Sequence, residues 1–85
     1  MDIGRDQGGQ GVKYMDGTDI APGDIIQIAT KYRGRVIASM DTEKYLPGQE
    51  GWAYLGEGIM VDTDFGGLVH YTVETADDFA LIKRP

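Results

Sequence analysis

Residues 58–74, with the sequence GIMVDTDFGGLVHYTVE, contain the pattern that decides the fold. Hydrophobic residues alternate with other residues on both sides of a turn signal, DFGG, at residues 64–67. This alternation has the period of a β-strand, because successive side chains of a strand point to opposite faces. The stretch therefore predicts two antiparallel strands, residues 58–64 and 68–74, that are joined in a tight hairpin.

Three further strands are expected around this pair. Residues 24–32 follow a Pro-Gly turn signal and are rich in isoleucine, and residues 35–40 alternate again. The Arg-Gly pair at residues 33–34 predicts the turn between these two strands. A last short strand is expected at residues 79–83, after one helical turn at residues 75–78, and no stretch of helical period exceeds 11 residues.

Five short strands separated by turn signals indicate a small antiparallel barrel or sandwich. The expected order of elements is an opening strand pair, a long loop at residues 41–56, a tight hairpin, a helical turn and a short closing strand. This order is typical of a Src-homology-3-like (SH3-like) barrel, so the expected fold is mostly β, a five-stranded antiparallel SH3-like barrel. It would form a single domain over residues 12–85, and the Gly-rich residues 1–11 would form a flexible N-terminal arm.

The composition limits the partners that the chain can bind. Its 85 residues carry a net charge of −6 and include no cysteine. A chain of this length forms one domain, and without cysteine it has no disulfides or thiolate metal sites. The negative charge disfavours nucleic acids and anionic membranes, which are bound mainly through Lys and Arg, whereas a basic protein partner fits.

Hydropathy predicts a protein that does not enter membranes. No hydrophobic run approaches the roughly 20 residues of a membrane span, and no signal-type apolar segment follows Met1. We therefore expect a cytoplasmic protein that is a monomer or a weak homodimer.

Several motifs resemble a group of small uncharacterised bacterial proteins. These motifs are Asp-Gly-Thr at residues 16–18, Pro-Gly-Asp at 22–24, Trp-Ala-Tyr-Leu at 52–55, Gly-Ile-Met-Val at 58–61 and Gly-Leu-Val-His-Tyr at 67–71. The resemblance covers about residues 16–84 and implies no activity. The Pro-Gly-Asp strand start is also similar to the openings of many small barrels, which is a likeness of fold alone.

The sequence contains no residue set that points to catalysis. His70 is the only histidine and Ser39 the only serine, and no nucleophile-elbow motif surrounds Ser39. Residues 62–64 begin like a calcium loop, but the ligands that such a loop needs at its fifth and twelfth positions are missing. We therefore expect no enzyme, no cofactor and no metal site. The competing hypothesis is a small enzyme or metal protein built on His70 with Asp62 or Asp64.

The aromatic side chains of the long loop are the main candidates for function. Tyr45, Trp52 and Tyr54 lie within or next to acidic sequence, and small barrels often present such side chains as a groove for polyproline or cationic groups. Three acids would favour a basic peptide there: Glu43, Glu50 and Glu57. The alternative interpretation makes Trp52 a core plug that anchors its loop.

One basic cluster, Lys-Tyr-Arg-Gly-Arg at residues 31–35, is either a solvated hairpin tip or a phosphate contact with Tyr32 stacking on a base. The expected function is a non-enzymatic module that engages a protein or peptide partner. The expected partner-binding residues are Tyr45, Trp52, Tyr54, Tyr32, Arg33 and Arg35. The alternatives are a nucleic-acid-associated barrel that uses residues 31–35, and an acidic inhibitor or immunity-type protein.

Overall fold

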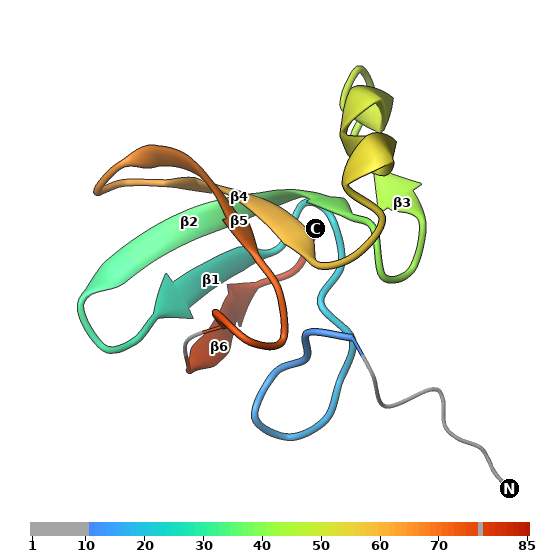
Figure 1. The fold of residues 1–85 in the computed structure, drawn as a ribbon. Helices are drawn as coiled ribbons and strands as arrows, with labels where there is room; N and C mark the ends of the chain where they lie inside the picture. The colour runs from blue at the N-terminus through green and yellow to red at the C-terminus, as the bar shows by residue number, and fades with distance from the viewer. Residues whose placement is uncertain (1–10, 77) are drawn as a thin grey trace, which may run out of the picture.

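The computed structural model describes residues 11–76 and 78–85, which form an open antiparallel sheet. Its strands are β1 (Ile25–Ile28), β2 (Tyr32–Ser39), β3 (Lys44–Tyr45), β4 (Ile59–Thr63), β5 (Gly67–Tyr71) and β6 (Phe79–Lys83). A 3-10 helix, η2 (Glu50–Leu55), lies between β3 and β4. The strand order is β5-β4-β2-β1-β6, and β3 pairs with the end of β2 (Figure 1). No helix within the described residues is long and apolar enough to cross a membrane.

The prediction of a mostly-β antiparallel fold is confirmed, but two of its details are wrong. The described residues form six strands instead of five, because residues 44–45, expected in a loop, pair with β2. The sheet is also not closed into a barrel, since β5 and β6 are its two ends. Tyr71 and Phe79, one from each end strand, instead meet edge to face with ring centroids 5.1 Å apart. The expected arm lies outside the described residues, apart from Gly11.

The hairpin of β1 and β2 turns earlier than the sequence predicts. Ile28 pairs with Tyr32, so the turn lies at residues 29–31, where Ala29 has a φ of 61°. Gly34, expected in the turn, is buried inside β2. A Cβ atom at Gly34 would lie 2.6 Å from Cγ1 of Val61, so the residue is a glycine because β4 packs closely there.

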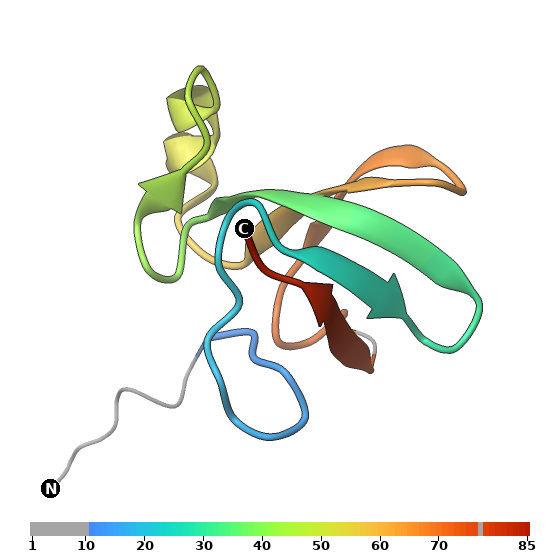
Figure 2. The ribbon, with the colours of Figure 1, turned by 180° about the vertical axis from the view of Figure 1, so that it is seen from behind.

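The main hydrophobic core combines one face of the sheet with the N-terminal segment at residues 12–20. It consists of Val12, Tyr14, Ile20, Ile26, Ile28, Val36, Ile59, Val61, Tyr71 and Phe79. The N-terminal segment is closed into a loop by the pairing of Lys13 with Asp19, which also form an ion pair. Figures 1 and 2 show this loop, in blue, beside β6. The segment therefore covers hydrophobic side chains that the open sheet would otherwise expose.

A buried carboxylate joins this segment to one end of the β1–β6 strand pair, where β1 begins and β6 ends. Asp24 is fully buried; its Oδ1 accepts a hydrogen bond from Nε of Arg84 (3.0 Å), and its Oδ2 accepts one from Nη2 (2.9 Å). Oδ2 also accepts hydrogen bonds from the Tyr14 hydroxyl (2.5 Å) and the Ala21 amide (3.1 Å). Nη2 of Arg84 donates in addition to the carbonyl oxygen of Asp19 (3.1 Å). We call Asp24, Tyr14 and Arg84 the Asp24 clamp.

The hydrogen bonds of the clamp fix its protonation state. Burial alone would raise the pKa of Asp24, but the hydrogen bonds from Arg84, Tyr14 and the Ala21 amide outweigh it and hold the pKa below its ordinary value. Burial and the neighbouring carboxylate raise the pKa of Tyr14, so its hydroxyl stays protonated and donates to Asp24. The clamp therefore contains a carboxylate anion, a protonated phenol and a guanidinium cation.

Replacing Asp24 by Asn keeps the shape of the side chain but removes its charge. We expect Asp24→Asn to lower the free energy of unfolding by about 2–3 kcal/mol, because hydrogen bonds to a charged group are lost in a buried place. Asp19→Asn is the matched control, since Asp19 forms an exposed ion pair with Lys13 and should cost less than about 1 kcal/mol. Urea denaturation followed by circular dichroism measures both, and equal losses would contradict a special role for Asp24.

The lowered pKa of Asp24 also predicts how stability depends on pH. A carboxyl whose pKa is lower in the folded than in the unfolded chain stabilises the fold fully above the unfolded pKa, about 3.9. That contribution is lost as the pH falls through the folded pKa. The wild type and Asp24→Asn should thus differ in their free energy of unfolding by a constant amount from about pH 5.5 to 8. Below about pH 4 this difference should become smaller. If this difference grew as the pH falls, the pKa of Asp24 would be raised in the folded protein, which would contradict the prediction.

Candidate functional site

Residues 41–57, which include β3 and η2, form a lobe at one end of the sheet (Figure 1). We call this segment the aromatic lobe. It is attached through a second hydrophobic cluster of four buried side chains: Ile37, Ala38, Met40 and Met60. Four partly buried lobe side chains pack against that cluster: Tyr45, Leu46, Trp52 and Leu55. The lobe is thus a structured part of the domain with a small core of its own.

Local interactions give the lobe its shape. Asp41 closes its base, because its Oδ1 accepts the Gly58 amide (2.9 Å) and its Oδ2 accepts the Val12 amide (2.8 Å). η2 ends at Leu55 and is capped by Gly56, which has a φ of 82° and donates its amide hydrogen to the carbonyl oxygen of Ala53 (3.1 Å). Glycine takes this left-handed conformation without steric cost. The chain therefore leaves η2 sharply and returns to the sheet as β4.

Trp52 anchors the lobe to the sheet. Its side chain is half-buried against the second cluster, and its Nε1–H donates a hydrogen bond to Oε1 of Gln49 (2.8 Å). Tyr45 is also half-buried there, beside Ala38 in the pairing of β3 with β2. These two aromatic side chains therefore hold the lobe in place and present only part of their surface.

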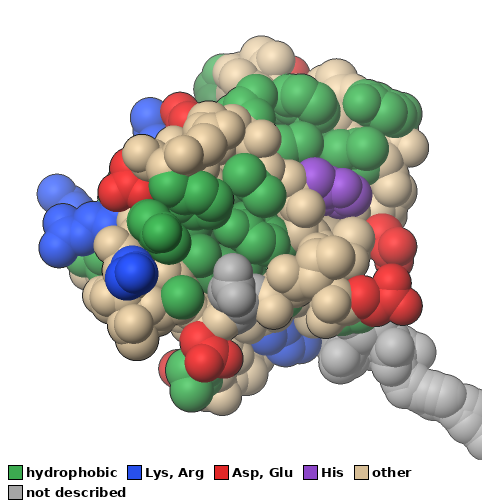
Figure 3. Space-filling model, turned by 60° about the vertical axis from the view of Figure 1, so that its left-hand side comes forward, with side chains coloured by type: hydrophobic (Ala, Val, Ile, Leu, Met, Phe, Trp, Pro, Cys, Tyr) green, Lys and Arg blue, Asp and Glu red, His purple; other side chains and the backbone are tan. Residues whose placement is uncertain are grey.

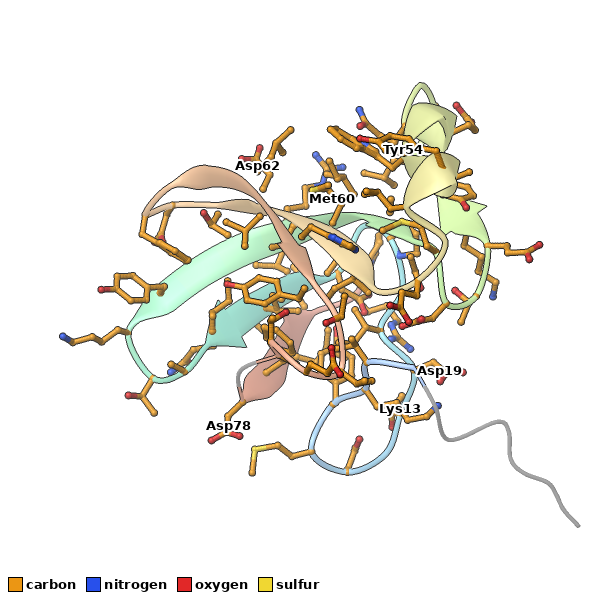
Figure 4. All side chains as sticks on the ribbon, in the orientation of Figure 1. Lys13, Asp19, Tyr54, Met60, Asp62 and Asp78 are labelled. Atoms are coloured by element: carbon orange, nitrogen blue, oxygen red, sulfur yellow. The ribbon has the colours of Figure 1, made fainter. Side chains whose placement is uncertain are left out.

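Tyr54 differs from both, since 77% of its surface is exposed. Figure 4 labels this side chain beside η2. On the same lobe lies a hollow of about 390 Å³ that is lined by Met40, Glu43, Tyr45, Ala53 and Gly56. The lobe also carries four exposed acids and a single lysine; the acids are Asp41, Glu43, Glu50 and Glu57. The arrangement combines an exposed aromatic ring, a shallow hollow with a carboxylate at its wall, and local negative charge.

The other predicted binding residues lie at the far end of the sheet from the lobe (Figure 2). Tyr32 packs against Phe65 with ring centroids 4.5 Å apart and ring planes tilted by 43°, and both rings are partly exposed. Arg35 pairs with Asp62 across β2 and β4, and Asp64 accepts the Arg33 amide (3.2 Å), so acids stand beside these two basic residues. Figure 3 shows acidic side chains among the basic ones at this end, beside a broad hydrophobic group.

The six predicted binding residues therefore form two separate groups. Tyr45, Trp52 and Tyr54 share the aromatic lobe, whereas Tyr32, Arg33 and Arg35 belong to β2. The sequence missed Phe65 as a partner of Tyr32, although an aromatic residue inside a Gly-containing hairpin turn was a visible signal. It also missed the hollow, because the hollow depends on how η2 folds over Met40.

His70 has a structural contact at the base of the lobe. Its Nε2 lies 2.8 Å from the carbonyl oxygen of Glu57, and because a carbonyl only accepts, Nε2 carries the hydrogen and donates it. Met60 is its neighbour across β4 and β5. In residues 11–76 and 78–85, no group of three or more His, Cys, Asp or Glu side chains is placed to hold a metal ion.

The chain matches no protein-family model, no curated protein and no solved structure. Residues 11–76 and 78–85 offer three candidate surfaces for binding: the aromatic lobe, the pair of Tyr32 and Phe65, and the outer edge of β6.

The different burial of Trp52 and Tyr54 predicts different effects on stability. We expect Trp52→Ala to lower the free energy of unfolding by about 2 kcal/mol, less than the loss for a fully buried aromatic side chain. Tyr54→Ala should change it by less than about 0.5 kcal/mol, because the ring is mostly exposed. Denaturation should be followed by circular dichroism in both variants. Trp52 is the only tryptophan, so Trp52→Ala has no tryptophan fluorescence to follow. Equal costs would contradict the separation of an anchor from a surface residue.

Proposed function

We propose that the aromatic lobe binds a basic segment of a partner protein and that the chain acts without catalysis. The observation that carries this proposal is the exposure of Tyr54 within an acidic lobe. A large exposed aromatic side chain beside a hollow is typical of a contact surface, because it supplies a large area of contact at a low cost in side-chain entropy.

The chemistry of the lobe favours a cationic occupant. A Lys or Arg side chain of the partner can place its aliphatic stem in the hollow against Met40 and Tyr45, with its charge near Glu43. A second cation can stack on the face of Tyr54. The four acids of the lobe, together with the net charge of −6, would also speed the encounter with a basic partner.

The finer assignment of the fold is part of the same proposal. The pairing of β6 with β1, and a tight β4–β5 hairpin before the short last strand, support a likeness to an SH3-like small barrel that has remained open. We propose this likeness together with the kinship to the small bacterial proteins and a cytoplasmic location. An inhibitor or immunity-type role would use the same acidic surface.

Calorimetric titration with a short peptide rich in Lys and Arg tests the proposal, with Trp52 fluorescence as a local reporter. At low salt we expect the basic peptide to bind and a peptide with Glu in place of Lys and Arg not to bind. Tyr54→Ala and Glu43→Gln should each weaken binding roughly fivefold, as expected for the loss of about 1 kcal/mol of cation contact. Matched controls are Tyr32→Ala and Glu74→Gln, an exposed tyrosine and an exposed acid away from the lobe.

Two outcomes would overturn this proposal. One is equal binding of the basic and acidic peptides. The other is a loss of binding in Tyr32→Ala that matches the loss in Tyr54→Ala. Binding of single-stranded DNA at about 50 mM salt that disappears in Tyr32→Ala would favour the nucleic-acid alternative, which rests on the exposed pair of Tyr32 and Phe65.

A further inference from the structure

β6 is an end strand of the sheet and carries exposed hydrophobic side chains. It pairs with β1 along one edge, and in the described part of the chain no strand pairs with its other edge. Leu81 is 41% and Ile82 44% exposed. The pairing of β6 with β1 skips Ile82, which is the extra residue of a bulge, so Leu81 and Ile82 do not simply alternate between the two faces of the strand. An end strand of this kind offers a row of backbone hydrogen-bonding groups to another strand.

The hydrophobic surface continues from β6 onto the neighbouring N-terminal loop. A hollow of about 300 Å³ lies between them, lined by Tyr14, Met15, Asp16, Thr18, Phe79, Ala80 and Leu81. Met15, on the loop side, is 77% exposed. A strand placed along β6 would therefore also cover hydrophobic side chains beside the strand.

The charges at the two ends of β6 indicate which kind of strand can pair with its outer edge. Asp78 precedes the strand, and Lys83 stands at its other end, where the neighbouring Arg84 is held by Asp24; Figure 4 shows Asp78 at the start of β6. An antiparallel pair of two such strands brings the acid of each copy near the basic end of the other. A parallel pair would place like charges opposite each other, which is unfavourable. The strand is thus complementary to itself in the antiparallel direction.

We propose that the outer edge of β6 pairs with β6 of a second copy of this chain, antiparallel and centred on Leu81. In this register Phe79 lies opposite Lys83 of the second copy, so the carboxylate of Asp78 comes near the exposed ammonium of Lys83, while Arg84 stays with Asp24. The two sheets would continue into each other across a two-fold axis, which is the commonest symmetry of homo-oligomers. One short strand pair and the neighbouring hollow make a small interface, so the dimer is weak, with a dissociation constant on the order of 10–1,000 μM.

Sedimentation over a concentration series tests the dimer. We expect the average mass of the wild type to rise toward that of a dimer between about 10 μM and 1 mM. Leu81→Lys should remain a monomer, because it places a charge at the centre of the interface. Leu68→Lys is the matched control, since Leu68 is 51% exposed on β5, the opposite end strand, and should behave like the wild type.

A cysteine cross-link tests the register without depending on the stability of the lysine variants. The chain has no cysteine, so a single introduced thiol can pair only with its copy. Directly opposite residues of antiparallel strands have Cβ atoms about 4.5–5.5 Å apart, close to disulfide range. Leu81→Cys should therefore oxidise to a covalent dimer faster than Leu68→Cys. A monomer at every concentration, equal cross-linking rates, or a dimer lost in Leu68→Lys but kept in Leu81→Lys would each overturn the proposal.

Discussion

The buried carboxylate of Asp24 is the constraint on which the rest of the structure depends. A carboxylate without access to water is costly unless charged and polar groups surround it, and here Arg84 and Tyr14 provide those groups. Because Arg84 directly follows β6, its ion pair with Asp24 holds that strand against β1. Tyr14 belongs to the segment that covers the main core. One anion thus fixes both the last strand and the cover of the open sheet.

The pattern of the sequence predicted the strands well where alternation was long enough to be seen. β6 has the expected bounds, and the hairpin of β4 and β5 lies within the expected residues. β3 was missed because a strand of two residues has no period of its own. Gly34 was assigned to a turn because of its local propensity. A glycine is needed there because Val61 of another strand approaches the backbone too closely for a Cβ atom. Contacts between distant segments leave no local signal of this kind.

In the candidate site, too, the sequence pattern predicts some features, and contacts between distant segments decide the others. Sequence spacing placed Tyr45, Trp52 and Tyr54 together, and the structure does bring them into one lobe. Spacing could not separate Trp52 from Tyr54, because only the packing of η2 decides which ring faces the second cluster. The Asp24 clamp was beyond reach for a similar reason. Asp24 and Arg84 are 60 residues apart, and each has the appearance of an ordinary surface charge in the sequence.

The aromatic lobe and the outer edge of β6 are compatible with simultaneous use. The lobe is attached to β2 and β4, whereas β6 lies beyond β1, so pairing through β6 leaves the lobe uncovered. A dimer of the proposed kind would present two acidic lobes on one continuous sheet. Two weak contacts to a partner with repeated basic segments bind far more tightly than one, because the second contact forms within the same complex. Dimerisation would thus raise the affinity for such a partner, since the hollow of one lobe offers little contact area. The Asp24 clamp would support the pairing surface, since it fixes β6 and the loop beside it.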